Sequence, residues 1–396
     1  MRSRPLWFLT LLALGAGTVL GLLAPHLGTV IKPIGLLFLQ ALKLLVVPLV
    51  LVSITHAVGS LSNVGTAGRM GAYALIWYVG TTVAAVPLGL AIMRFVSVVP
   101  MPDLELADGL TGSVSATPDL TQLIPPNIVS AMAEGNILGL IVFALLLGVA
   151  ANKSGNAGQA FRDFMESAMA VVQALTKLIV AAAPIGVFSL MASTVAAYGV
   201  DVLRPLLLLI ALVYFASVLH VVVTLQLLLR FGAQIPFLQF IRAIFPAQLM
   251  AFSTTTAAGT LPESMRCAEQ NLDVRPHVSR FVLPVGATLN MDGTALYQLL
   301  VSLFVAQWYG VDLTMTQYLT LSLTVILMSI GTAAIPSGGL VVLSAVLASI
   351  GLPIEAVAMV AGIDRLLDMA RTTVNVTGDL AVTAIIDRRL RRTEDV

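Results

Sequence analysis

Long stretches without any Asp, Glu, Lys or Arg dominate the hydrophobic pattern of this chain. They run from Pro5 to Pro25, Met70 to Met93, Leu178 to Val200, Pro205 to Leu229, Ala243 to Pro262 and Leu313 to Pro353. A helix of about 20 apolar residues is long enough to cross the hydrocarbon core of a bilayer. A membrane barrel would instead show short segments of alternating polarity. The pattern therefore predicts an all-helical integral membrane protein.

The composition agrees with a chain that lies in lipid. Apolar residues make up 58% of its 396 residues and charged residues only 10%, against roughly a quarter in a soluble domain. The single cysteine, Cys267, excludes an internal disulfide and a cysteine metal centre, and the four histidines are scattered without ligand spacing. The net charge of +1 comes without a basic stripe. We therefore expect no nucleic-acid partner, no structural metal and no organic cofactor.

Charged residues in the connections predict how the chain is oriented. Lys and Arg collect near residues 2–4, 153–162, 230–242, 266–280 and 388–392, and positively charged loops lie in the cytoplasm. Residues 101–119 carry only acidic charge, which places them outside. We expect about eight spans, including a retained first span, with both termini cytoplasmic. The short loops favour the inner membrane of a prokaryotic cell.

Two hydrophobic segments left out of this count are interrupted where a spanning helix would continue. Residues 251–262 read AFSTTTAAGTLP, and residues 329–339 read SIGTAAIPSGG. Gly, Pro and hydroxyl residues free backbone groups that lipid does not satisfy, so this backbone must be buried in protein or line a cavity. Interrupted segments at matching places in two half-repeats mark transporter binding sites. We predict two re-entrant helical hairpins, arranged as inverted repeats, around a binding site.

The last apolar segment carries a stripe of polar residues. Asp368, Arg371, Thr372, Asn375 and Asp379 follow one another at steps of 3, 1, 3 and 4, which places them on one face of a helix. Ionisable groups inside a bilayer cost several kcal/mol each and usually mark a substrate or ion pathway. A buried ion-pair network that only holds helices together is the alternative, although such pairs seldom repay their desolvation.

A count of the buried charges indicates which ligands the site takes. Asp292, Asp364, Asp368 and Asp379 contribute −4, and Arg365 with Arg371 contributes +2, which leaves −2. An acidic amino acid would add −1, so about three monovalent cations would neutralise the loaded site if every carboxylate is ionised. Carboxylates, amides, hydroxyls and freed carbonyls are the oxygen ligands that hard cations prefer. The count permits sodium symport without proving it.

Two functional classes other than transport fit the buried aspartates less well. Two buried aspartates occur in intramembrane aspartyl proteases, but that chemistry needs carboxylates that share a proton. Arg371 beside Asp368 would keep that carboxylate ionised, so we expect no enzyme. An ion channel is disfavoured because a pair of occluding hairpins suits alternating access better than a continuous pore.

Three segments carry a resemblance to a known family. They are NMDGTALYQ at 290–298, SIGTAAIP at 329–336 and LDMARTTVNVTGD at 367–379. The chain resembles the dicarboxylate/amino acid:cation symporter family, which includes archaeal aspartate and mammalian glutamate transporters. The resemblance implies eight spans with two hairpins, a homotrimer, and an elevator motion of a transport domain past a static scaffold.

The resemblance also implies a division of the chain into domains. The scaffold and trimerisation domain would contain spans 1, 2, 4 and 5, in residues 1–68 and 119–200. The transport domain would comprise residues 69–98 and 201–388 and would include spans 3 and 6. The remaining transport elements would be hairpin 1 at about 236–268, span 7 at about 273–308, hairpin 2 at about 315–350 and span 8 at about 353–388.

By position, the resemblance assigns a role to individual residues. Asp368 would bind the substrate ammonium and Arg371 its side-chain carboxylate, because a planar guanidinium grips a carboxylate with two bonds. The other substrate residues would be Thr256, Thr294, Ile335, Gly339, Thr372 and Asn375. The resemblance also implies three sodium sites. The first would use Gly286, Asn290, Asn375 and Asp379. The second would use Tyr78, Thr81, Thr82, Asn290 and Asp292, and the third would use Thr288, Ser329, Ile330 and Thr332.

The first hairpin departs from the family pattern. Archaeal members place an arginine before the serines of its tip, and mammalian members place one directly after the aspartate of the last span, where this chain has Met369. We propose that Arg365 supplies this balancing charge. Gln298 stands where mammalian glutamate transporters have a proton- and potassium-linked glutamate, so no potassium counter-transport is expected.

The presence of both Asp368 and Arg371 favours aspartate or glutamate as substrate. Family members for neutral amino acids lack the arginine, and members for plain dicarboxylates lack the aspartate. A C4-dicarboxylate carrier, a neutral amino acid symporter and a proton-coupled glutamate/aspartate symporter stay open as alternatives. The sequence thus predicts a sodium-coupled amino acid symporter.

Overall fold

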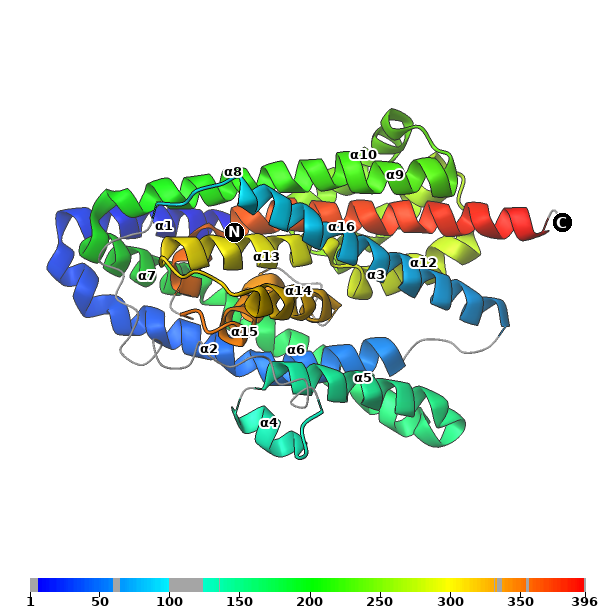
Figure 1. Cartoon of the computed structure of the whole chain (residues 1–396), viewed down its shortest axis with the longest axis horizontal. Helices are drawn as coiled ribbons and strands as arrows, with labels where there is room; N and C mark the ends of the chain where they lie inside the picture. The colour runs from blue at the N-terminus through cyan, green and yellow to red at the C-terminus, as the bar shows by residue number, and fades with distance from the viewer. Residues whose placement is uncertain are drawn as a thin grey trace, which may run out of the picture.

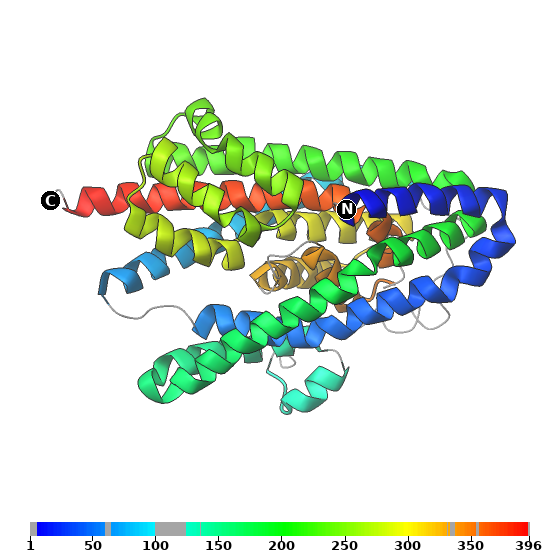
Figure 2. The same ribbon diagram turned by 180° about the vertical axis from the view of Figure 1, so that it is seen from behind.

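The computed structural model describes residues 6–59, 65–99, 124–134, 136–330, 332, 337–353 and 356–394. Across these residues the regular structure is helical throughout, as the sequence predicts. Figure 1 shows an elongated bundle in which most helices run along its long axis, and Figure 2 shows the same bundle from behind.

The N-terminal group of helices is built around the long helix α2. It contains α1 (Leu6–Leu23), α2 (Pro25–Gly59), α4 (Ile128–Glu134), α5 (Ile137–Lys153), α6 (Gln159–Ala181) and α7 (Ala183–Tyr198). Helix α7 packs along α1 and α2, while α5 and α6 pack against α2. Glycines permit the closest approach, since a Cβ at Gly21 or Gly28 would lie 2.6 or 2.7 Å from the carbonyl oxygen of Ala192. These helices fall in the ranges predicted for the scaffold.

The second group surrounds the last helix, α16 (Ala356–Glu394). It contains α3 (Gly65–Arg94), α8 (Leu203–Leu219), α9 (Gln226–Leu228), α10 (Phe237–Thr254), α11 (Ala257–Arg266), α12 (Pro276–Leu289), α13 (Asp292–Trp308), α14 (Met315–Ile330) and α15 (Gly338–Ser349). Helices α8, α10, α12, α13 and α3 all pack against α16, which Figure 1 shows in red within the bundle. A helix this polar can lie at membrane depth because its neighbours shield it from lipid.

Helical hairpins form at both predicted interruptions. Helix α10 packs against α11, and α14 packs against α15. At the first tip Thr255 has φ +53°, and Thr256 caps α11 by accepting a hydrogen bond of 3.2 Å from the Gly259 amide. At the second tip Ser337 has φ +59° directly before α15. Predicted site residue Ile335 lies outside the described residues.

The segment predicted as span 7, at about 273–308, consists of two helices with a break between them. Helix α12 ends at Leu289 and α13 begins at Asp292, with non-helical dihedral angles at Asn290 and Met291. The Asn290 amide donates back to the Gly286 carbonyl at 2.8 Å, which closes α12. This break turns the side chain of Asn290 toward α3 and α16, where its partners Thr81 and Asp379 lie.

Several helices of the described residues are long and apolar enough to cross a membrane. By length and composition they are Pro25–Gly59, Met70–Arg94, Gly155–Ala181, Ala183–Ala233 and Pro276–Trp308. Shorter apolar helices are also present, so the chain is a multi-pass membrane protein. The number of about eight spans stays a prediction.

Candidate binding site

The Asp368 carboxylate on α16 accepts three hydrogen bonds. Its Oδ1 accepts a bond of 3.0 Å from Arg371 Nε and one of 2.9 Å from Thr372 Oγ1. Its Oδ2 accepts a bond of 2.7 Å from the backbone amide of Ser337, at the tip of the second hairpin. Residues 368, 371 and 372 meet because helical neighbours three and four apart share a face. The site on α16 is therefore tied directly to hairpin 2.

The Arg371 guanidinium is held on several sides. Besides Asp368, its Nη1 donates to Asp364 Oδ1 at 3.2 Å, and its Cζ lies 4.6 Å from the centre of the Tyr297 ring. A Cβ at Gly339 would lie only 2.5 Å from Nη1, so glycine is required there for hairpin 2 to approach the arginine. Arg371 is only 2% exposed. A buried guanidinium fixed in this way is a pre-formed anchor for a carboxylate.

A small cavity opens beside this arginine. It is lined by Thr255, Ala257, Met291, Thr294, Thr332, Gly339, Asp368, Arg371, Thr372 and Asn375. Both hairpins, the α12–α13 break and α16 thus contribute to one cavity. Six of the eight predicted substrate residues line it: Thr294, Gly339, Asp368, Arg371, Thr372 and Asn375. Thr256 is not among the lining residues and caps α11 instead, while its neighbours Thr255 and Ala257 face the cavity.

Asn375 connects the cavity to the helix break. Its Nδ2 donates to Thr294 Oγ1 at 3.1 Å, and its Oδ1 accepts a bond of 2.8 Å from the Gly293 amide. Its backbone carbonyl accepts a bond of 3.3 Å from Asn290 Nδ2. Through this bond to Asn290, Asn375 contacts a second cluster of polar residues.

The second cluster centres on Asn290, which is fully buried. Its Nδ2 donates to Asp379 Oδ1 at 2.9 Å, and its Oδ1 accepts a bond of 3.2 Å from Thr81 Oγ1. Gly286 belongs to the same cluster, because a Cβ there would lie 2.5 Å from Tyr78 Oη and 2.6 Å from Asp379 Oδ1. The structure thus brings together most residues of the first two predicted cation sites. Carboxylate, amide, hydroxyl and carbonyl oxygens form a donor set suited to a hard monovalent cation.

Asp292 lies at the start of α13, also fully buried. Its Oδ1 accepts a bond of 3.0 Å from the Gly293 amide, and its Oδ2 lies 3.0 Å from His220 Nε2. His220 is not among the residues predicted for the site, because the four histidines lack ligand spacing in the sequence. The available signal was a lone histidine within the otherwise uncharged stretch 205–229. Thr82 is buried on α3, where its hydroxyl donates to the Tyr78 carbonyl at 2.9 Å.

The residues of the third predicted cation site are less closely connected. The hydroxyls of Thr288, Ser329 and Thr332 donate to carbonyls of their own helical segments, at 2.8 to 2.9 Å. Helices α12 and α14 do contact each other, and Thr332 also lines the cavity beside Arg371. Ile330, the last residue of α14, packs against the core cluster that contains Leu289. The hydrogen bonds of the described residues thus do not join these four side chains.

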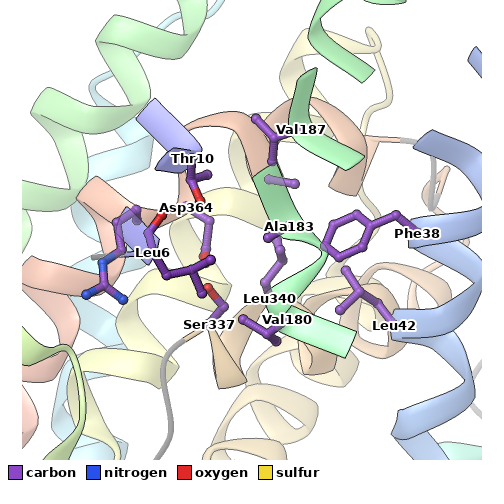
Figure 3. Close-up of a pocket in the computed structure, with 12 residues that line it drawn as sticks. Leu6, Thr10, Phe38, Leu42, Val180, Ala183, Val187, Ser337, Leu340 and Asp364 are labelled. Carbon is purple, nitrogen blue, oxygen red and sulfur yellow. Dashed lines mark hydrogen bonds between the residues drawn. The ribbon is translucent and has the colours of Figure 1, made fainter. Parts of the chain in front are cut away.

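Arg365 on α16 lies between hairpin 1 and the N-terminal helices. Its Nη2 approaches the Thr254 carbonyl of hairpin 1 at 3.5 Å. With Asp364 and Ser337 it borders a second, larger cavity. Figure 3 shows that the opposite wall of this cavity is apolar and comes from the N-terminal helices, including Phe38 and Val187.

A multi-pass helical bundle with a buried charged cavity beneath two helical hairpins has the architecture of a secondary transporter. Residues 6–389 match the sequence model of the "Sodium:dicarboxylate symporter family". The chain belongs to this family, as the resemblance predicted, and its relatives are transporters, not enzymes.

Curated relatives from bacteria and mammals match almost the whole chain. It is 35% identical to the "Proton/glutamate-aspartate symporter" of Bacillus subtilis (strain 168), over 96% of this chain and 94% of the relative. It is 32% identical to the "Proton/sodium-glutamate symport protein" of Geobacillus stearothermophilus, over 94% of this chain and 92% of the relative. Identity to "Excitatory amino acid transporter 3" of Mus musculus is also 32%, over 89% of this chain and 78% of the relative.

Proposed function

We propose that this protein couples the inward movement of sodium to the uptake of aspartate or glutamate. The observation that carries the proposal is the pairing of Asp368 with Arg371 in one buried cavity. An acidic amino acid has an ammonium that needs a carboxylate and a side-chain carboxylate that needs a guanidinium. A plain dicarboxylate would leave Asp368 facing another anion, and a neutral amino acid would leave Arg371 without a partner from the substrate.

The polar lining supports the orientation of such a substrate. Asp368 would hold the ammonium and Arg371 the side-chain carboxylate. Thr294, Thr372 and Asn375 would add hydroxyl and amide hydrogen bonds. The amide of Ser337 already bonds Asp368, so binding at the aspartate would act directly on hairpin 2, which we propose closes over the substrate.

The oxygen-rich clusters around Asn290 and Asp292 support cation coupling. Asp364 and Asp368 balance Arg365 and Arg371, so Asp292, Asp379 and an acidic substrate would leave −3 if all are ionised. About three sodium ions would neutralise this charge. We propose that they bind first and order Asn290, Asn375 and Asp379, and that each ion raises substrate affinity by a reciprocal coupling free energy. Proton coupling is the second candidate, and the name of the Bacillus subtilis relative favours it.

An elevator movement is supported by the unequal contact of the two hairpins with the N-terminal helices. Helix α15 of hairpin 2 packs against α2 and α5, and its residues Val341, Val342 and Leu343 are fully buried. Among the described residues, neither helix of hairpin 1 makes a comparable contact with α2 or α5. We propose that the second group of helices slides along the scaffold, so that hairpin 1 takes the position against α2 in the opposite state. The homotrimer, the inner-membrane location and the cytoplasmic termini belong to the same proposal.

The decisive experiment is uptake of labelled L-aspartate into proteoliposomes of the purified protein. An inward sodium gradient is compared with proton and potassium gradients, and unlabelled succinate is added as a competitor. Uptake that requires sodium and resists succinate supports the proposal. Uptake driven by protons alone refutes sodium coupling, and strong inhibition by succinate refutes the amino acid specificity.

A further inference from the structure

His220, which contacts Asp292, has no function in the mechanism described so far. Both side chains are fully buried, and His220 Nε2 lies 3.0 Å from Asp292 Oδ2. The two residues are 72 positions apart in the sequence, so their contact depends on the packing of α8 against α13. Burial of two polar side chains costs free energy because each group loses its hydration, so a functional role for the pair is expected.

For an ionised Asp292, the hydrogen-bond geometry assigns the donor atom of the histidine. Asp292 Oδ1 already accepts the Gly293 amide at 3.0 Å, and an ionised carboxylate can only accept hydrogen bonds. His220 Nε2 must therefore carry a hydrogen and donate it to Oδ2. Nδ1 has no hydrogen-bond partner among the described residues, which suits the bare nitrogen of this tautomer better than an unpaired N–H.

The hydrogen-bond pattern of the helix also changes at the histidine, although its dihedral angles are helical. Helix α8 ends at Leu219, and a π-helical segment, η5 (His220–Leu225), begins at His220 itself. Single π-helical turns within helices are rare and occur often at functional sites. The segment η5 packs against α3 and α16, the two helices that carry Thr81 and Asp379. His220 is thus placed where the candidate cation ligands converge.

We propose that His220 is the positioning residue of Asp292 within the cation site. Outer hydrogen-bond partners orient metal-binding carboxylates, and their loss typically weakens metal binding about 10- to 100-fold. The His220 bond on Oδ2 and the Gly293 bond on Oδ1 fix the plane of the carboxylate and leave its other lone pairs for a cation. Gly378 closes the same side, since a Cβ there would lie 3.0 Å from Asp292 Oδ2. This inference rests on the proposed cation coupling and extends it.

The test uses two amide replacements of matched polarity. In His220→Gln the amide nitrogen occupies nearly the position of Nε2 and can still donate to Asp292. In His220→Asn it lies near the position of Nδ1 and falls short of the carboxylate. His220→Leu removes the donor while it keeps the bulk, and Ser217→Ala, one turn earlier on α8, is the packing control. Size-exclusion chromatography and thermal unfolding check that each variant folds.

The measured quantities are the sodium concentration for half-maximal aspartate uptake and the KM for aspartate at saturating sodium. We expect His220→Asn and His220→Leu to raise the sodium constant at least about 10-fold, with little change in KM. His220→Gln and Ser217→Ala should stay close to the parent. If His220→Leu does not fold, the comparison of His220→Gln with His220→Asn still tests whether the Nε2 donor positions Asp292.

Three results would overturn the inference. Sodium constants that are the same in all variants show that the bond does not position a cation ligand. A glutamine variant as impaired as the asparagine variant shows that the Nε2 donor is not what matters. A parent protein without any sodium response overturns the proposed coupling and this inference together, and is told apart from the other two results before any variant is made.

Discussion

The substitution Asp368→Asn tests the substrate site most directly. The change keeps the shape of the side chain but removes the charge that would meet the substrate ammonium. In the parent, Asp368 accepts bonds from Arg371, Thr372 and the Ser337 amide, at 2.7 to 3.0 Å. In asparagine an NH₂ group replaces one of the two carboxylate oxygens. This group cannot accept a hydrogen bond from the donors that face it, so at least one of the bonds is lost.

The size of the effect follows from the burial of the group. Asp368 is only 1% exposed, and removing one partner of a buried charge pair costs about 2 to 5 kcal/mol. A loss of about 3 kcal/mol corresponds to a decrease in affinity of about 100-fold. We therefore expect Asp368→Asn to weaken aspartate binding by at least this factor. We expect this decrease in aspartate affinity whether sodium or protons drive transport.

The assay is equilibrium binding of labelled L-aspartate to purified protein at saturating sodium. Met369→Leu is the matched control, because it conserves volume one position away and its side chain is not among those lining the cavity. The control should bind like the parent. Retention of parental affinity by Asp368→Asn would refute the assignment of the ammonium to this carboxylate.

Two further predictions concern the surroundings of Arg371. Arg365→Ala should reduce aspartate affinity in the same assay, because Arg365 neutralises one of the two nearby carboxylates and approaches hairpin 1 at Thr254; unchanged affinity and uptake would exclude the balancing role. Gly339→Ala should also weaken aspartate binding while the protein still folds, since the new Cβ would lie 2.5 Å from Arg371 Nη1 and push the guanidinium away. Gly80→Ala, where a Cβ has open space, is the control, and equal binding by both variants would show that the approach of hairpin 2 does not hold the arginine.

The sequence was sufficient for the features that depend on local periodicity. Uncharged runs of about 20 residues predict membrane helices from length alone. Gly, Pro and hydroxyl residues at 251–262 and 329–339 locate both hairpin tips, because helix interruption is a local property. The polar stripe on the last helix follows from steps of three and four residues, and the bond between Arg371 and Asp368 is a contact of this kind.

Contacts between distant segments were decided only by the tertiary structure. The break between α12 and α13 was not predicted, because Asn290 and Met291 do not resemble a helix stop in isolation. Asn290 finds Thr81 across 209 positions, and His220 finds Asp292 across 72. Helical periodicity determines which residues share a face, but it does not determine which faces meet. That choice depends on the packing of all the helices around α16, where buried polar groups must find partners wherever the chain brings them.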